Sequence, residues 1–437
     1  MNIKPNTSKV SQAQKLAEYT KPGVVRILNY AIVEWQFNDP NPNVDNYMKQ
    51  LNYQSLVGGS GSGAIISSDG YIVTNAHVVE YSKMEDKDIV NEAFKQLVTG
   101  IAAYYQEDYD SAYQYMVSYT QYKTIKRELK VILPGGDTLD GEIKSYGAPI
   151  NEGKDAAVLK IEGRNLPTLT LGNSDSIQNQ DNIWVIGYPA AADSDLLSPD
   201  SSLVSSMNAG QISATSKKTE QGSPVIQLNA ASTHGNSGGP VINDKGEIVG
   251  LLTFRGDTVN GQEVQGFNFA VPVNTVKEFV NQAGAKSAKS DTDKLYKEGL
   301  AYYWGGYYKQ ALDKFEAVQR IYPNQSEIKR YISNAEKKVG DSAILWSEYS
   351  TLFYIFDGVA GLIIVLLMIF TFAGKTKQAQ PALAAAGVAP APAPSPAPAP
   401  APETTTNTAE KNILADIDVQ TLLQALQDQQ KKQQKDE

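Results

Sequence analysis

The stretch Asn229-Ala-Ala-Ser-Thr-His-Gly-Asn-Ser-Gly-Gly-Pro240 places Ser237 among glycines, with apolar runs on both sides. Glycine permits the tight turns that expose a serine hydroxyl, and an exposed hydroxyl next to a base can act as a nucleophile. The base in such a site is most often a histidine. The chain has two histidines, His77 and His234, so one of these two is expected to supply it.

A second arrangement also fits this stretch. The string Gly235-Asn-Ser-Gly-Gly239 matches the G-x-S-x-G turn of α/β-hydrolases, whose histidine follows the serine in the chain. Both histidines here precede Ser237, so this interpretation is excluded. The order that remains is histidine, then aspartate, then serine.

His77 is the predicted base. The sequence before it predicts a hairpin with strands at 64–67 and 71–74. His77 comes just after the second strand, which would hold its imidazole in a fixed position for proton transfer. His234 lies three residues before Ser237 in the same turn, where it is poorly placed to take the proton. We expect a loop or subsite role for His234.

Asp155 is the predicted third member of the site. It stands at the start of the apolar run Asp155-Ala-Ala-Val-Leu-Lys-Ile161, which predicts a strand. A carboxylate there can accept the imidazole N–H, fix its tautomer and stabilise the imidazolium. The alternative is a turn residue that begins a strand. The order His77, Asp155, Ser237 favours the catalytic role.

Residues 21–284 carry many short apolar segments separated by turn residues, without alternating helices. This pattern predicts an all-β barrel or sandwich. Residues 81–127 interrupt it, because they are rich in Tyr, Glu, Asp, Gln and Lys and place apolar residues at helical spacing. We predict a helical insertion there, either a solvated surface excursion or a gate or docking arm over the active site.

Several strings, in order along residues 24–280, resemble the trypsin-like serine peptidases of the bacterial HtrA (Deg) family. They extend over roughly three fifths of the chain. The matching strings are Gly61-Ser-Gly-Ala-Ile-Ile66, Ile72-Val-Thr-Asn-Ala-His-Val-Val79, Asp155-Ala-Ala-Val-Leu-Lys-Ile161, Leu171-Gly-Asn-Ser-Asp175, Val185-Ile-Gly-Tyr-Pro189, Gly235-Asn-Ser-Gly-Gly-Pro240 and Gly266-Phe-Asn-Phe-Ala-Val-Pro272.

The resemblance implies a mainly β chain with a chymotrypsin-like double β-barrel and the active site between the barrels. It also implies cleavage of unfolded or damaged proteins through an acyl-enzyme, without a metal or organic cofactor, and a homo-oligomer, often a trimer. By the same resemblance Ser237 attacks, His77 carries the proton and Asp155 orients His77. The N–H groups of Gly235 and Ser237 would form the oxyanion hole, which stabilises charge in the transition state.

The resemblance also implies a substrate pocket, with Ala231 at its base and Thr253 and Phe254 in its wall. Because Ala231 carries no carboxylate, we expect a small or medium apolar residue before the cleaved bond. The chain departs from the family pattern in three ways. The insertion at 81–127 is additional, His234 replaces the usual proline, and the sequence after the protease does not resemble a PDZ domain.

Residues 291–340 resemble one tetratricopeptide repeat followed by a capping helix. A single repeat buries too little surface to be stable alone. We therefore expect it to pack on the protease, to pair with another subunit or to bind a protein partner. The alternative is a helical spacer that lifts the protease from a membrane. The residues at the spacing of the repeat are Leu295, Gly299, Tyr302, Ala311, Phe315 and Pro323.

Residues 350–373 are predicted to cross a membrane once. The run Leu352–Ala373 has 22 residues, and about 20 apolar residues span a bilayer. Its aspartate, Asp357, is expected near the interface, where a charge costs less. The family resemblance implies a protease domain outside the cytoplasm, although residues 1–23 show no apolar run typical of a signal peptide.

The remaining segments are polar or of low complexity. Residues 1–20 are predicted as an N-terminal arm, residues 374–410 as an Ala/Pro-rich linker and residues 411–437 as an amphipathic helix. The net charge of -9 argues against a nucleic-acid partner. The chain has no cysteine and two histidines, which argues against disulfides and against metal sites built on these residues.

Two functions from different classes are compatible with the sequence. The first is a membrane-anchored serine endopeptidase that cleaves unfolded or damaged proteins in protein quality control. The second is a protease fold that works as a chaperone, sensor or scaffold and binds partners through the helical segment. The complete triad and oxyanion strings favour the endopeptidase.

Overall fold

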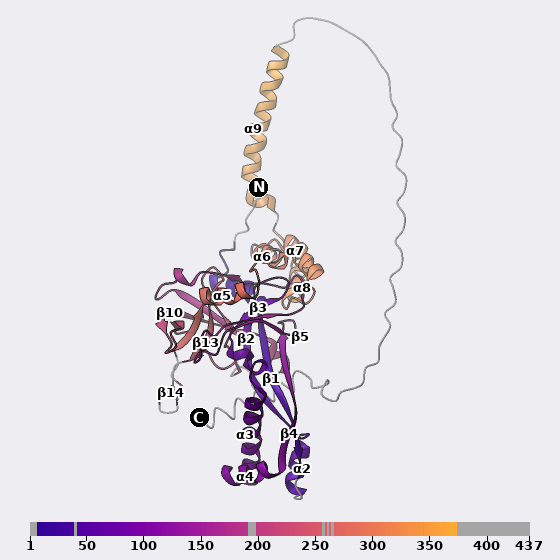
Figure 1. The fold of residues 1–437 in the computed structure, drawn as a ribbon. Helices are drawn as coiled ribbons and strands as arrows, with labels where there is room; N and C mark the ends of the chain where they lie inside the picture. The colour runs from indigo at the N-terminus through magenta and orange to yellow at the C-terminus, as the bar shows by residue number, and fades with distance from the viewer. Residues whose placement is uncertain are drawn as a thin grey trace, which may run out of the picture. The chain divides into compact units, whose positions relative to one another are not determined.

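The computed structural model describes residues 7–38, 42–190, 198–255, 258–259, 262–263, 266–343 and 345–373 (Figure 1). The described residues divide into two compact units after Ser342. The first unit holds the described strands and helices α1 to α8, and the second holds helix α9 (Leu345–Ala373).

The first sheet has seven strands in the order β5-β4-β1-β2-β3-β7-β6. Its two edge strands, β5 and β6, are separated only by Gly141, so they are halves of one bent strand and the sheet closes into a barrel. Glycine suits this bend, because a Cβ atom there would lie 3.0 Å from the Leu129 side chain. The strands are β1 (Val24–Phe37), β2 (Gln54–Ile65), β3 (Tyr71–Thr74), β4 (Thr120–Ile132), β5 (Thr138–Asp140), β6 (Glu142–Tyr146) and β7 (Ala157–Lys160).

The second sheet has the order β12-β9-β10-β11-β16-β13-β8, and a further pairing of β12 with β13 closes it into a second barrel. β8 pairs in parallel with β13, outside the closed ring. The strands are β8 (Thr170–Leu171), β9 (Asn182–Gly187), β10 (Ser206–Lys218), β11 (Pro224–Leu228), β12 (Pro240–Ile242), β13 (Glu247–Arg255) and β16 (Asn268–Pro272), and β14 (Thr258–Val259) pairs with β15 (Gln262–Glu263) in a separate hairpin.

One apolar core joins the two barrels. Val73 of β3 and Ile186 of β9 belong to the same buried cluster, which Phe279 of helix α5 (Val273–Gln282) also enters. Burial of apolar side chains is the main favourable term in folding, so this shared core fixes the barrels against each other. The predicted fold class, a chymotrypsin-like double β-barrel in a mainly β chain, is confirmed.

The predicted N-terminal arm, residues 1–20, contains helix α1 (Gln12–Thr20). Ser11 and Gln14 form a capping box, in which each side chain accepts a hydrogen bond from the backbone N–H of the other residue. Leu16 is 2% exposed and packs in the core that the barrels share. The described part of the arm is therefore docked on the two barrels.

The helical insertion is shorter than predicted. Residues 86–119 contain helices α3 (Asp86–Tyr105) and α4 (Tyr109–Tyr119), but residues 120–127 belong to β4. The prediction of helix is wrong for 120–127. This run has Thr and Tyr at alternate positions, which favours a strand, and it pairs with the second half of β1, residues 31–37.

Helices α3 and α4 pack together with α2 (Pro42–Gln50) and the second half of β1, and we call this part of the protein the insert lobe. Figure 1 shows these helices beside the end of β1 and the beginning of β4. The lobe has its own apolar core, so it is packed and differs from the solvated excursion considered above. Buried side chains of this core are Val33, Trp35, Met48, Ile89, Leu97 and Met116.

Three helices occupy the segment predicted at 291–340: α6 (Asp291–Trp304), α7 (Tyr308–Ile321) and α8 (Ile328–Glu336). A Cβ atom at Gly299 would lie 2.6 Å from the Phe315 ring, so glycine is required where α6 and α7 cross. Tyr296, Phe315 and Tyr331 contact one another in the core between the helices. Such aromatic pairs add to the stability that burial provides.

This helical segment packs on the two-barrel body. Asp293 of α6 is 5% exposed, and both its carboxylate oxygens accept the backbone N–H of Thr168 at 3.1 Å. The Thr168 hydroxyl donates to the same carboxylate at 2.5 Å. Thr292 donates to the Asn165 carbonyl at 2.6 Å, and the Asn165 side chain donates to α7. The buried groups of Asp293 and Thr168 would lose their hydrogen bonds if the helical segment shifted. These contacts therefore specify one position of the segment on the barrels.

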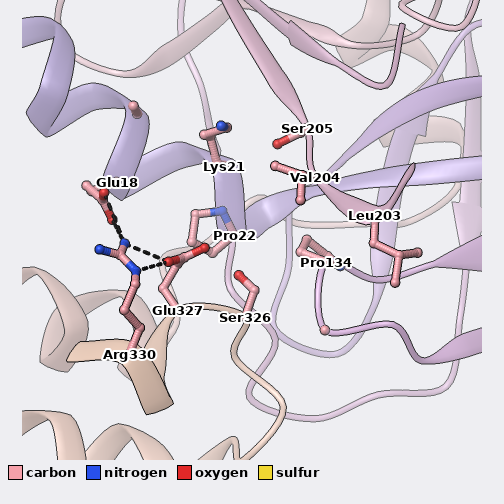
Figure 2. A pocket seen from close by; sticks show the side chains of 12 residues that line it. Glu18, Lys21, Pro22, Pro134, Leu203, Val204, Ser205, Ser326, Glu327 and Arg330 are labelled. Atoms are coloured by element: carbon pink, nitrogen blue, oxygen red, sulfur yellow. Dashed lines mark hydrogen bonds and ion pairs between the residues drawn. The ribbon is translucent and has the colours of Figure 1, made fainter. Parts of the chain in front are cut away.

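A pocket of about 420 Å³ lies where α1, α8 and both barrels meet (Figure 2). Arg330 of α8 pairs with Glu18 of α1 at 3.3 Å and with Glu327 at 2.6 Å on its wall. These ion pairs connect the N-terminal helix with the helical segment. None of the described site residues predicted from the sequence lines this pocket.

Helix α9 contains the predicted membrane span. Its window Ser350–Thr371 has 22 residues and a mean hydropathy of 2.5, so it is long and apolar enough to cross a membrane. Its apolar side chains, among them Leu362 and Phe370, are exposed. The predicted linker at 374–410 and the predicted helix at 411–437 lie outside the described residues.

Candidate active site

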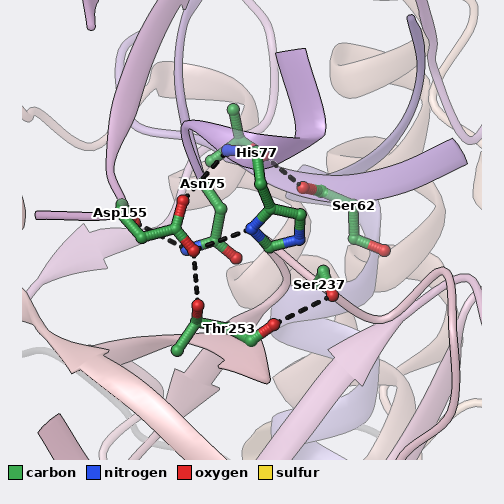
Figure 3. A network of polar contacts seen from close by, with 7 residues as sticks. Ser62, Asn75, His77, Asp155, Ser237 and Thr253 are labelled. Carbon is green, nitrogen blue, oxygen red and sulfur yellow. Dashed lines mark hydrogen bonds and ion pairs between the residues drawn. The ribbon is translucent and has the colours of Figure 1, made fainter. Parts of the chain in front are cut away.

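Strand pairing brings His77 and Asp155 together. β3 pairs with β7 so that Thr74 lies opposite Ala157, which places the residues beyond these strand ends side by side. The Nδ1 atom of His77 lies 2.7 Å from Oδ2 of Asp155, and the backbone N–H of His77 donates to Oδ1 at 3.0 Å (Figure 3). The carboxylate thus fixes both the backbone and the ring of His77.

Asp155 is completely buried and fully hydrogen-bonded. Besides the bonds to His77, its Oδ2 accepts the hydroxyl of Thr253. The Asn75 side chain donates to the Asp155 backbone carbonyl at 2.9 Å. Burial alone would raise the pKa of Asp155, but the charge of His77 and the hydrogen bonds from His77 and Thr253 hold that pKa below its ordinary value. Asp155 is therefore ionised at neutral pH.

The surroundings of His77 act on its basicity in opposite directions. Burial lowers the pKa of His77, but the charge of Asp155 and the hydrogen bond with it outweigh this effect and raise the pKa above its ordinary value. When Nδ1 donates to Asp155, Nε2 is left as the acceptor. The side chain of His77 is 31% exposed. It can therefore meet both Ser237 and a substrate.

Ser237 lies beside the His77 ring (Figure 3). Its hydroxyl donates to the Thr253 carbonyl at 3.2 Å. Within the described chain, no hydrogen bond joins Ser237 to His77. The structure thus brings the three predicted catalytic residues to one place, with the Ser237 hydroxyl turned toward Thr253.

The residues just before Ser237 form a tight turn. The N–H of Asn236 donates to the Thr233 carbonyl at 3.2 Å, and Gly235 has a φ of +89°, as in a type II turn. A Cβ atom at Gly235 would lie 2.3 Å from the Tyr188 carbonyl oxygen, so only glycine fits. Among the described residues, the N–H groups of Gly235 and Ser237 donate to no protein acceptor. Both are available to a ligand oxygen.

His234 belongs to this turn and lies outside the cluster of His77, Asp155 and Ser237. Its side chain is exposed. Its backbone carbonyl accepts the N–H of Ala190 at 2.7 Å. His234 thus lies in an exposed turn, and its loop or subsite role stays a prediction.

The structure describes two of the three side chains predicted to form the substrate pocket, those of Thr253 and Ala231. Thr253 is 3% exposed and its hydroxyl donates to Asp155, while the place of residue 253 in a pocket wall stays a prediction. Ala231 is exposed, and its carbonyl accepts the Asn208 side chain at 2.9 Å. Phe254 lies on β13 next to Thr253, and its side chain is outside the described part.

Sequence reasoning missed a buried polar pair next to Ala231. The Ser232 hydroxyl donates to the Asn268 side chain at 2.7 Å, and Asn268 donates to the Ala230 carbonyl at 2.5 Å. The pair joins the segment before Ser237 to β16. No local motif marks it, because Ser232 and Asn268 are 36 residues apart. Over the described ranges, no group of three His, Cys, Asp or Glu side chains is placed to hold a metal ion.

Residues 61–251 match the family described as a trypsin-like peptidase domain. The chain is 30% identical over 225 residues to the putative serine protease HhoB of Synechocystis sp. and 32% identical over 224 residues to a probable periplasmic serine endoprotease DegP-like of Halomonas elongata. These matches cover 50% and 51% of this chain but only 39% and 34% of the two relatives. The solved structure of the HtrA-type protease AlgW with decapeptide is 24% identical, with a TM-score of 0.41, and the match covers 63% of this chain and 67% of that chain.

Residues 61–251 are thus a trypsin-like peptidase domain, which contains His77, Asp155 and Ser237. Proteins similar to this domain are described as serine proteases, among them DegP-like endoproteases and the serine protease HTRA1B of Danio rerio. The predicted enzyme class and the predicted resemblance to the HtrA family are confirmed for this part of the chain.

Proposed function

We propose that the protein is a membrane-anchored serine endopeptidase that cleaves unfolded or damaged proteins. The observation that carries this proposal is the joint placement of Asp155, His77 and Ser237 beside two N–H groups that have no acceptor among the residues the structure describes. A base, a nucleophile and donors for developing charge are the parts that acyl transfer requires.

The reaction begins when the Ser237 hydroxyl turns from the Thr253 carbonyl to Nε2 of His77. Oγ then forms a bond to the carbonyl carbon of the substrate while its proton passes to Nε2. The N–H groups of Gly235 and Ser237 bind the resulting oxyanion. The carbon–nitrogen bond breaks as His77 returns the proton to the leaving amine. Water repeats the sequence on the acyl-enzyme, releases a carboxylic acid and restores Ser237.

The anchor in this proposal is helix α9. Its length and hydropathy suit a single membrane span. The protease domain is proposed to lie outside the cytoplasm, because one similar protein is described as a periplasmic endoprotease. A role in protein quality control follows from the proposed location and from the preference for unfolded substrates.

The test is degradation of casein, an unfolded substrate, by the full chain in detergent, beside the Ser237→Ala variant. We expect cleavage by the natural sequence and a loss of about 10⁶-fold in kcat for the variant, since removing the nucleophile removes the whole triad mechanism. A serine-reactive fluorophosphonate probe should label the natural sequence alone.

If the natural sequence neither cleaves casein nor reacts with the probe, the endopeptidase proposal is overturned. The chaperone or scaffold function then becomes the better explanation. That function would appear as suppression of casein aggregation by both proteins equally, because it does not use the Ser237 hydroxyl.

A further inference from the structure

Ser62 of β2 makes three hydrogen bonds to the second barrel, two of them with the turn that carries Ser237. It is completely buried. Its hydroxyl donates to the Gly235 carbonyl at 2.7 Å and accepts the N–H of Tyr188 at 2.9 Å. Its backbone N–H donates to the Ser237 carbonyl at 2.8 Å. One residue of the first barrel therefore holds three peptide groups of the second.

Together with two further hydrogen bonds, the Ser62 bonds to this turn hold the backbone carbonyls of four successive residues, 234–237, and we call the four donors anchors. In a trans peptide the N–H points opposite to the C=O of the same unit, so an anchored carbonyl fixes the direction of its N–H. The carbonyls of His234 and Asn236 therefore set the directions of the Gly235 and Ser237 N–H groups. The anchors are Ala190 N–H on His234, the Ser62 hydroxyl on Gly235, Gly239 N–H on Asn236 and Ser62 N–H on Ser237.

The peptide between Gly235 and Asn236 lies between the two N–H groups of the predicted oxyanion hole. Rotation of this peptide changes the angle between the two donors. Gly235 has a positive φ and no side chain, so its backbone resists such a rotation less than that of other residues. The hydrogen bond from Ser62 to the Gly235 carbonyl opposes the rotation directly.

We propose that the Ser62 hydroxyl is a positioning residue, which sets the oxyanion hole by fixing the Gly235–Asn236 peptide from the neighbouring barrel. This inference rests on the proposed endopeptidase function. Among the four anchors in the described chain, the Ser62 hydroxyl is the one supplied by a side chain. A single substitution can therefore remove it without touching His77, Asp155 or Ser237.

The test variant is Ser62→Ala in the full chain. Removing one donor from an oxyanion hole costs about 10²–10³ in kcat. Because Ser62 acts on a donor indirectly, we expect a loss of about 10–100-fold in kcat on a small p-nitrophenyl ester, with KM within about twofold. A peptide boronate, whose adduct places an oxygen in the oxyanion hole, should bind more weakly by the same factor as kcat.

Two further variants separate positioning from stability. Ser145→Ala removes a buried hydroxyl that donates to the Phe279 carbonyl at 2.8 Å, so it should lower thermal stability while leaving kcat unchanged. Ser62→Thr keeps a hydroxyl at position 62 and should restore most of the kcat that Ser62→Ala loses. A purely structural role for Ser62 would instead give two alanine variants that lose stability alike and keep their kcat.

The outcomes also separate this inference from the proposed function. If the natural sequence reacts with the fluorophosphonate probe and Ser62→Ala reacts at the same rate with unchanged kcat, the role of Ser62 is overturned and the endopeptidase stands. A loss confined to KM would overturn it as well. If the natural sequence does not react, both proposals fail together.

Discussion

Asp155 has no exposed surface, yet it keeps a negative charge because donors surround its carboxylate. An unpaired charge in such a position would be too costly to bury, and the group would take up a proton instead. The charge of Asp155 in turn raises the pKa of His77. The protonation of these two residues is therefore coupled.

This coupling gives a prediction about pH. Protonated His77 cannot accept the Ser237 proton, so activity should be lost as pH falls through the pKa of His77. Because this pKa is raised, the acid limb of kcat/KM should lie above the ordinary histidine value of about 6.5. In Asp155→Asn the negative charge is gone, so the limb of the residual activity should move to lower pH and kcat should fall by about 10⁴.

The measurement is a pH profile of kcat/KM for both proteins on one ester substrate. An acid limb at the same pH in both would show that Asp155 does not set the basicity of His77. Thermal unfolding at each pH serves as the control, since it shows that both proteins stay folded over the range compared.

The grouping of His77, Asp155 and Ser237 was predictable from sequence because each stands in a short local motif. The roles of Thr253 and Ser62 were not, because their partners are 98 and 173 residues away in the chain. Which hydroxyl meets which carbonyl depends on the register of strands and on the docking of two barrels. No periodicity in the sequence carries that information.

Helix α6 combines a helix cap with a docking contact. Ser290 caps the helix and Asp293 completes the capping box, while the same Asp293 carboxylate accepts the N–H and hydroxyl of Thr168. The same carboxylate therefore caps the helix and attaches it to the protease unit. The spacing of apolar residues predicts the helices. The docking contact could not be predicted, because it depends on the fold bringing residues 165–168 beside α6.

Asp293→Ala should destabilise the protease unit. It removes the cap partner and leaves the buried N–H of Thr168 without an acceptor, which together cost about 2–4 kcal/mol of unfolding free energy. The matched control is Asp291→Ala, whose side chain is exposed in the same turn and should cost less than about 1 kcal/mol. Urea denaturation of both variants measures the difference. Equal stabilities would contradict the docking role of Asp293.

The end of the insertion shows how an element is misassigned from composition. Residues 120–127 share the Tyr- and Lys-rich composition of the helices before them, which hid their alternation. In the structure they extend β4 along the second half of β1, and the helices of the insert lobe pack on this extended strand pair. The partner strand, rather than the local composition, decides the state of this segment.

At the scale of the whole molecule, the chain pairs an enzyme unit with a long apolar helix. We expect the full chain to sediment with membranes and to resist extraction with alkaline carbonate, because α9 suits a bilayer. An arginine at the middle of a span costs about 2.5–3.5 kcal/mol on insertion scales. Leu362→Arg together with Ile363→Arg should therefore move the protein to the soluble or aggregated fraction.

The control is Leu352→Arg, near the end of the same window, where a long side chain can reach the interface with its charge. This variant should remain in the membrane fraction. Retention of the double variant there, with carbonate resistance unchanged, would show that another part of the chain makes the attachment.

The predicted catalytic residues belong to different barrels, which the shared core and the Ser62 contacts join. His77 and Asp155 stand in the first barrel, while Ser237 and its turn belong to the second, more than 80 residues later than Asp155. Domains form from the N-terminus onward during synthesis. A growing chain on the ribosome therefore contains His77 and Asp155 before Ser237 is made, and a truncated translation product that ends before Ser237 lacks the proposed nucleophile.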